Sequence, residues 1–268
     1  MGLAIDTAVY AVTNPGASPS NDNTTAATGD SKTVRNFAQS GKAGLEFISR
    51  QGTTAGFVRV MSPRMHDVSK GLTYLPGETP AARLFPFEVE QPLYSGDSLQ
   101  ITVSGGTAEA DAAALGIYYT DLPGSDAKLK MLADVVPNLV NLKSVEIDVT
   151  QSGTAFTWVD AAITTTENLL KADTWYAVLG FDTDTAALVI GVKGPETANL
   201  RIGGPGPTST IATNDYFIRQ SQATGKPFIP VFNANNRAAY FVCLNCLAIS
   251  GTTKVSLELA ELAGSFSA

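Results

Sequence analysis

The 268-residue sequence is poor in the side chains from which most metal and nucleophilic sites are built. It contains two cysteines and one histidine. A structural zinc site needs four Cys or His ligands, and metal-dependent enzymes of the cupin type need several converging histidines. The single histidine, His66, could act as the base of a serine hydrolase, but the sequence contains no G-x-S-x-G nucleophile motif. These absences exclude zinc-finger, cupin and serine-hydrolase chemistry. We therefore interpret His66 as a loop residue and expect no metal and no cofactor.

The two cysteines, Cys243 and Cys246, lie within the strand-like run "AYFVCLNCLAIS". A redox-active CxxC pair sits at a helix N-terminus, where the thiolate is stabilised. In a strand, residues three apart point to opposite faces. The sequence therefore predicts a reduced, mostly buried pair of thiols.

Charged residues are also scarce, and long apolar runs are absent. Charged residues make up 16% of the chain, well below the usual quarter, and the net charge is −7. An acidic chain is not expected to bind nucleic acid generically. No apolar run reaches the ~18 residues that span a bilayer, and the N-terminus lacks the basic region of a signal peptide. We expect synthesis in a cytoplasm, a large core, and surface that is buried against other copies of the chain.

The basic residues are concentrated in one part of the sequence. Residues 32–83 carry eight basic and three acidic residues. This excess is consistent either with a basic face or with an ordinary solvated surface. No run of like charges reaches five or six residues, so the second interpretation is favoured.

Short runs rich in Val, Ile, Thr, Tyr and Phe, separated by turn residues, are typical of strands in an all-β sandwich or barrel. Residues 14–31, rich in Asn, Thr, Ser and Gly, are expected to form a loop or a loosely held arm. Helical spacing predicts two helices, over 125–136 and 213–225, the second ending at Gly225. The clearest strand runs of the first half are "LEFIS", "GFVRVMS", "RLFPFEVEQ", "SLQITVSG" and "AALGIYYTDL".

A pattern of two strands, a Gly/Pro loop, a helix and a strand occurs twice, about 75 residues apart. The second copy includes the runs Thr174 to Phe181 and Ala186 to Val192, which flank a polar turn and predict a hairpin. A period this long is not that of a solenoid. It favours two copies of a β domain, each with one inserted helix. The predicted organisation is an arm or loop over 1–34, a first domain over 35–150 and a second over 151–268.

Several local patterns have both a functional and a structural interpretation. Asp182 and Asp184 lack the further oxygen ligands of a calcium loop and are expected to form a turn. "RIGGPGPTST" (201–210) lacks the Lys-Ser/Thr of a phosphate loop and is expected to be a rigid connector. Two pairs of acids resemble glycosidase carboxylates, although exposed strand acids are common. These pairs are Glu88 with Glu90 and Glu258 with Glu261.

The order of elements, the inserted helices, the chain length and the segment "TGKPFIPVFNANN" together resemble a known family. Between residues 35 and 262 the chain is similar to the double jelly-roll major capsid proteins of tailless icosahedral viruses of bacteria and archaea. The resemblance implies an all-β fold of two tandem jelly-roll β-sandwiches, each with a short inserted helix. It also implies a virion protein without enzyme activity that forms pseudo-hexameric homotrimers.

The same resemblance implies the partners. They are other copies of the chain in the trimer and between capsomers, penton and minor capsid proteins, and an internal viral membrane. No sequence-specific nucleic acid is expected. Arg35, Lys42 and Arg50 would then be basic contacts on the inner face, toward anionic lipid or genome.

Two other functions remain open from the sequence. A carbohydrate- or receptor-binding β-sandwich, such as a fibre head or a lectin-like module, would use exposed aromatic residues for stacking. Trp158 and Trp175 are the candidates, although Trp175 lies in an apolar run and is expected in the core. A β-sandwich hydrolase would use one of the glutamate pairs.

Overall fold

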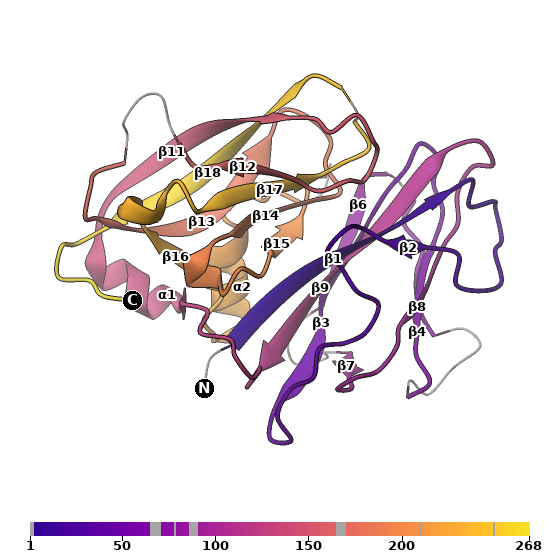
Figure 1. Cartoon of the computed structure of the whole chain (residues 1–268), viewed down its shortest axis with the longest axis horizontal. Coiled ribbons are helices and arrows are strands. Elements are labelled where there is room, and N and C mark those ends of the chain that lie inside the picture. The colour runs from indigo at the N-terminus through magenta and orange to yellow at the C-terminus, as the bar shows by residue number, and fades with distance from the viewer. Residues whose placement is uncertain are drawn as a thin grey trace.

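The computed structural model has an all-β architecture built from antiparallel sheets (Figure 1). It describes residues 3–64, 71–77, 79–85, 91–164, 170–208, 211–248 and 250–268. Four sheets pack as two sandwiches, one formed by strands β1–β9 and the other by β10–β18. Among the described residues, no helix has the length and apolar character needed to cross a membrane.

The first sandwich pairs a large sheet, in the order β2-β1-β9-β3-β6 with β7 also on β3, with a small sheet in the order β5-β4-β8. Its strands are β1 (Leu3–Thr13), β2 (Thr25–Ala26), β3 (Lys42–Gln51), β4 (Val58–Met61), β5 (Leu72–Tyr74), β6 (Ala81–Leu84), β7 (Pro92–Leu93), β8 (Gln100–Val103) and β9 (Ala110–Thr120).

The second sandwich pairs a large sheet in the order β10-β16-β13-β18-β11 with a small sheet in the order β12-β17-β14-β15. Its strands are β10 (Leu129–Lys130), β11 (Leu139–Thr150), β12 (Val159–Ala162), β13 (Trp175–Thr183), β14 (Val189–Lys193), β15 (Ile202–Pro205), β16 (Ile229–Asn233), β17 (Phe241–Asn245) and β18 (Thr252–Leu262). The helices are α1 (Leu132–Val135), α2 (Tyr216–Thr224) and the 3-10 turns η2 (Val136–Asn138), η3 (Pro195–Thr197) and η4 (Ala234–Asn236).

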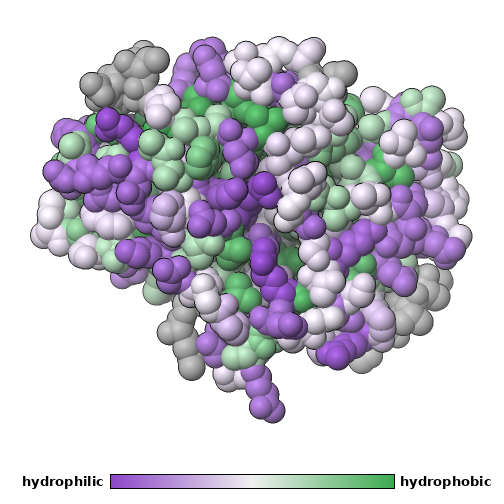
Figure 2. All heavy atoms as spheres, in the orientation of Figure 1, coloured by the Kyte–Doolittle hydropathy of each residue, from purple (hydrophilic) through white to green (hydrophobic). Residues whose placement is uncertain are grey.

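Each sandwich buries apolar side chains between its two sheets. In the first, Tyr10 and Leu115 of the large sheet belong to one core cluster with Val60 and Ile101 of the small sheet. Strand side chains alternate between the two faces, so the remaining apolar residues of β1 and β9 point away from this core. The outer surface in Figure 2 is covered mostly by hydrophilic or weakly hydrophobic residues, with small separate apolar areas.

The two sandwiches share one strand order. In each large sheet the first long strand lies beside the last strand. The last strand in turn lies beside the strand whose chain continues into the middle of the small sheet, at β4 or β14. In the first sandwich this series is β1-β9-β3, and in the second it is β11-β18-β13. The small sheets match in the same way, as β5-β4-β8 and β15-β14-β17.

The predicted hairpin over Thr174 to Val192 is wrong. Strand β13 pairs with β16 and β18, whereas β14 pairs with β15 and β17, so the connection at Asp182–Asp184 crosses from one sheet to the other. Strands β8 and β9 are joined by the same kind of crossing. A hairpin and a crossing have the same local signature, two apolar runs around a polar turn, because only distant partners distinguish them.

The predicted repeat of about 75 residues is also wrong in register. It matches β8–β9 with β13–β14, but in the sheets β13 and β14 take the places of β3 and β4. Strand β11, expected at the end of the first domain, pairs along its length with β18 of the second sandwich. The first sandwich therefore ends at Thr120, before the boundary at residue 150, and equivalent strands are nearly twice as far apart as the predicted period.

The N-terminal segment is part of the first sandwich and differs from the arm expected over residues 1–34. Strand β1 pairs with β9 along its whole length, from Leu3 opposite Thr120 to Thr13 opposite Ala110. The apolar residues of β1 are buried on both faces, which a free arm would not allow. The composition of residues 14–31 obscured this role, because it is typical of a loop.

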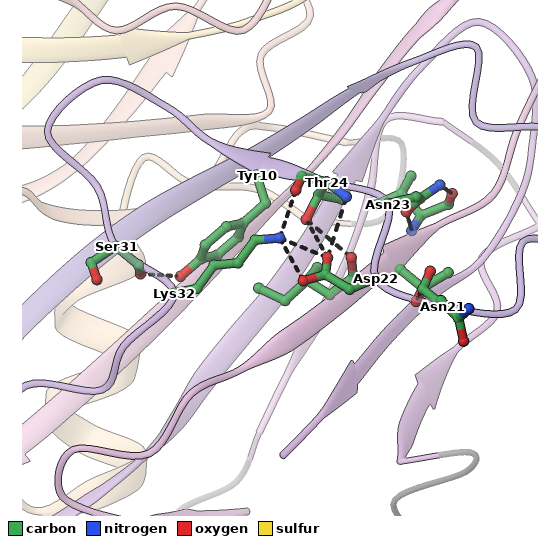
Figure 3. A network of polar contacts seen from close by, with 10 residues as sticks. Tyr10, Asn21, Asp22, Asn23, Thr24, Ser31 and Lys32 are labelled. Atoms are coloured by element: carbon green, nitrogen blue, oxygen red, sulfur yellow. Dashed lines mark hydrogen bonds and ion pairs between the residues drawn. The ribbon is translucent and has the colours of Figure 1, made fainter. Parts of the chain in front are cut away.

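Residues 21–33 run beside β8 and are held by side chains (Figure 3). The amide of Asn23 donates to the carbonyl of Val103 at 2.8 Å and accepts from its N–H at 3.0 Å. Lys32 Nζ contacts both carboxylate oxygens of Asp22 and the carbonyl of Thr24. These side-chain hydrogen bonds take the place of most of the backbone hydrogen bonds that a paired strand would make. A segment of polar composition can therefore have a defined conformation here.

One of the two predicted helices is confirmed. Helix α2 occupies Tyr216–Thr224, and Gly225 follows it in the left-handed conformation (φ 61°). The helix predicted over 125–136 is reduced to α1 and is preceded by β10, which pairs with β16. Tertiary pairing outweighed helical spacing at this position. No described residue of the first sandwich is helical, whereas the described part of the second sandwich contains α2.

Of the strand runs, "LEFIS", "GFVRVMS", "SLQITVSG" and "AALGIYYTDL" lie in β3, β4, β8 and β9, which confirms them. The run "RLFPFEVEQ" begins in β6, and its residues 86–90 lie outside the described part of the chain.

Candidate assembly surfaces

The large sheet of the first sandwich is covered on its outer face by the second sandwich. Val9 and Phe47 pack there with Leu188 and Val189. Leu3, Ile5 and Tyr118 belong to the main core cluster of the second sandwich. A sheet buried on both faces needs nearly continuous apolar strands, and β9 is buried over Asp111–Tyr119.

Hydrogen bonds join the two sandwiches across this contact. The N–H of Thr7 donates to the carbonyl of Arg201 at 2.9 Å, and Gly203 N–H donates to Thr7 Oγ1 at 3.2 Å. A Cβ at Gly203 would lie 3.2 Å from Thr7 Oγ1, so glycine permits this close approach of β1 and β15. Further along, Ser49 Oγ donates to the carbonyl of Leu188 at 2.9 Å. The contact thus combines apolar burial with paired polar groups.

A buried carboxyl lies in the same contact. Tyr216 Oη, at the start of α2, donates to Glu46 Oε1 at 2.6 Å, and both side chains are buried. Burial raises the pKa of Glu46 to about 8, while the hydrogen bond from Tyr216 acts in the opposite direction. Glu46 is therefore mostly protonated at neutral pH.

Asp30 connects the N-terminal segment to the second sandwich. Its carboxylate accepts from Val9 N at 2.7 Å, from Trp158 Nε1 at 2.7 Å and from Arg201 Nη1 at 3.2 Å. The Arg201 guanidinium also lies 4.7 Å from the Trp158 ring centroid. Burial raises the pKa of Asp30 to about 6, against the hydrogen bonds that stabilise its charged form. Sequence reasoning missed this residue, because nothing in its loop-like segment marks it.

The three predicted inner-face contacts do not form one surface. The Arg50 side chain is fully buried, 2.9 Å from Asp111, and donates to the carbonyls of Thr54 and Ser104. Arg50 therefore cannot contact lipid or genome in this fold, which corrects the prediction. It lies near the end of β3, which is buried from Ala43 onward, so strand position rather than residue type decided its burial. Arg35 is half-exposed and pairs with Asp6 at 2.6 Å, and Lys42 is exposed at the start of β3.

The remaining candidate sites take structural roles where the structure describes them. Cys243 and Cys246 are free and buried, which confirms the expectation of a reduced pair. Asp184 accepts from the backbone N–H of Lys254, and Asp182 accepts from Thr183 N–H, so both belong to the crossing between sheets. Among the residues with a described placement, no three His, Cys, Asp or Glu side chains form a group that could hold a metal.

The glutamate pairs do not form a described carboxylate site. Glu258 accepts from Ser144 Oγ at 2.6 Å, whereas the buried Glu261 pairs with Lys143 and Lys171. Glu88, Glu90 and His66 lie outside the described residues.

The glycine-rich segment and the two tryptophans are also engaged within the chain. Within "RIGGPGPTST", Ile202–Pro205 is the buried strand β15, which carries the contact between the sandwiches. Trp158 is held by Asp30 and Arg201, and Trp175 packs edge-on against Phe266. Both tryptophans are half-buried and do not form exposed stacking platforms.

Large apolar side chains that remain exposed fall into two groups. The first, here called the edge patch, lies on β6 and directly after β5 and β7 at one edge of the first sandwich. The second, here called the β11 patch, lies on η2 and the start of β11. The edge patch consists of Leu75, Leu84 and Tyr94, and the β11 patch of Val136, Leu139, Val140 and Leu142.

Comparisons with known proteins give no relative on which function can be argued. No protein-family model and no curated protein matches the chain. Among solved structures, the chain is similar to BuGH86 in complex with neoagarooctaose, at 10% identity and a TM-score of 0.17. A second structure of BuGH86, a substituted form with the same ligand, gives 10% identity and a TM-score of 0.16. In both cases the match covers 89% of this chain and only 35% of the other, and likeness this low carries no argument.

Proposed function

We propose that the chain is a structural capsid protein of the double jelly-roll type. In this proposal it has no enzyme activity and assembles as pseudo-hexameric homotrimers that tile an icosahedral shell. The observation that carries the proposal is the strand order. A jelly roll has eight strands divided between two sheets. The eight strands β11–β18 divide between two sheets, in the orders β11-β18-β13-β16 and β12-β17-β14-β15, and every connection except β14–β15 crosses from one sheet to the other.

The first sandwich supports the proposal with the same order. Its large sheet runs β1-β9-β3 and ends in β6 and β7, and its small sheet runs β5-β4-β8. The segment over residues 21–33 lies beside β8 where a fourth strand of the small sheet would be. This placement supports the assignment of eight jelly-roll positions to each sandwich.

The relative placement of the sandwiches favours stacking in a wall. Gln51, at the end of β3, donates to the carbonyl of Ala186 in the β13–β14 crossing, so corresponding ends lie together. Two similar blocks in each subunit give six in a trimer, which is the symmetry a hexagonal lattice needs.

The test is the state of the purified chain in solution. We expect light scattering to give three times the chain mass of 28.0 kDa, and negative-stain microscopy to show six-lobed particles and shells. A monomer at all concentrations contradicts the proposal. A monomer that binds glycans favours the carbohydrate-binding alternative.

A further inference from the structure

On the basis of the proposed function, we infer that the β11 patch and outer β11–β18 face of one copy dock on the edge patch of a second copy. This contact between two chains has the same geometry as the contact between the two sandwiches within one chain. It is head-to-tail, because it joins different surfaces of the two copies.

The first step is the equivalence of β1 and β11. Ile5 pairs with Tyr118, two residues before the end of β9, and Leu142 pairs with Ala260, two residues before the end of β18. Counting on from these pairs, Thr7 corresponds to Ser144. The inward residues correspond in the same way, since Ala8 and Val145 both lie in the cores of their sandwiches.

The second step concerns burial. Leu3 and Ile5 are 6% and 0% exposed because the second sandwich covers them. Their counterparts at the start of β11, Leu139 and Leu142, are 44% and 60% exposed. The same apolar character thus occurs at equivalent positions, covered in one sandwich and uncovered in the other. The start of β11 would be covered by a surface equivalent to the one that covers β1 within the chain.

The third step identifies that surface. Within the chain, β1 is covered by β15, the edge strand that pairs with β14. The equivalent edge strand in the first sandwich is β5, which pairs with β4. Leu75, 73% exposed, directly follows β5, at the position of Gly206 directly after β15. The equivalence therefore brings Leu75 of the edge patch to the β11 patch, and Leu84 and Tyr94 lie on or directly after the edge strands of the adjoining large sheet.

Charge complementarity favours the same pairing. The outward side chains of β11 and β18 include Glu146, Asp148 and Glu258, with Lys254 as their basic neighbour. The edge patch is flanked by the exposed Arg64 and Arg83. Opposite charges across an interface set its register and suppress wrong partners. A head-to-tail contact closes a ring when the rotation allows it, and a trimer is the ring that the proposed function requires.

Cross-linking tests the assignment directly. The double variant Ser144→Cys/Leu75→Cys, treated with a short bismaleimide, should give covalently linked dimers and trimers. The yield should be about tenfold above that of the matched control Ala238→Cys/Leu75→Cys. Ala238 is exposed in the loop after β16, at the opposite end of the large sheet from β11. The native cysteines are buried and do not compete. Linked dimers from Ser144→Cys alone would indicate a symmetric contact and overturn the inference.

A second variant separates this inference from the proposed function. Leu142→Arg places a cation in the apolar contact and should convert trimers to monomers that keep the near-ultraviolet circular dichroism signal of the folded chain, because Leu142 is exposed within the chain. Ala238→Arg should leave trimers intact. If Leu142→Arg still forms trimers, the surface assignment is wrong while the capsid proposal stands. If the unmodified chain is a monomer, both fail.

Discussion

At the scale of single residues, the contact between the sandwiches depends on polar groups that lie out of water. Asp30, Glu46 and Thr7 each bridge elements far apart in the sequence. Burying a carboxyl costs free energy unless its partners are kept, so the loss of one partner leaves the other unsatisfied. The stability of the contact should therefore respond to single substitutions and to pH.

Replacing Asp30 should destabilise the protein strongly. Asp30→Ala leaves Trp158 Nε1 and Arg201 without their buried acceptor, and we expect a loss of about 3 kcal/mol in the free energy of unfolding. Urea denaturation at neutral pH measures this change. The exposed Asp126→Ala serves as the control and should stay within about 0.5 kcal/mol of the unmodified chain. Equal effects of the two substitutions would contradict the bridging role of Asp30.

Glu46 should make the protein less stable as pH rises. Its pKa is raised from 4.5 to about 8 in the folded state, so the folded chain holds a proton that the unfolded chain releases. The stabilising contribution is complete below pH 4.5 and is lost as pH rises through about 8, by up to about 1 kcal/mol per pH unit. Glu46→Gln, which stays neutral, should flatten this slope in denaturation series from pH 5 to pH 9. An unchanged slope would show that Glu46 is charged in the folded protein.

At the scale of elements, β1 is the strand on which both sandwiches depend. It pairs with β9, and its two faces lie in the first core and in the second. If β1 detached from the sheet, both hydrophobic cores would be exposed to solvent. Helix α2 has a related role, because its first turn contacts β3 through Tyr216 and its length packs on β13.

Removing β1 should prevent folding. A chain that starts at residue 14 loses the partner of β9 and the residues Leu3 and Ile5 from the second core. We expect an insoluble or unfolded product, judged by the soluble fraction and by the loss of the near-ultraviolet circular dichroism signal. A chain that lacks only residues 1–2 should fold normally. A folded product without residues 1–13 would restore the interpretation of this segment as an arm.

At the scale of the whole molecule, the two sandwiches share buried surface and are not independent domains joined by a linker. Residues of the first sandwich belong to the main core of the second, and a third apolar cluster lies between them. Interfaces of this apolar kind couple the stability of the parts that they join. Among the described residues, the large apolar side chains that stay exposed lie in the two patches on which assembly is proposed.

The chain should therefore unfold in one thermal transition. Calorimetry should give equal van't Hoff and calorimetric enthalpies, as for a single cooperative unit. Gly203→Val places side-chain atoms against Ile190 and Thr7, and should lower the midpoint or split the transition. Two separate transitions in the unmodified chain would show that the sandwiches are energetically independent.

The sequence by itself determined the all-β class, most of the strands, helix α2 and the buried state of the cysteine pair. These features depend on local properties such as apolar alternation, turn residues and the Gly225 stop. The tertiary structure alone decided which strands pair, that β13 and β14 lie in different sheets, and that Arg50 is buried beside Asp111. Pairing and burial depend on residues far apart in the chain, so the short-range pattern around Asp182 or Arg50 carries no trace of them.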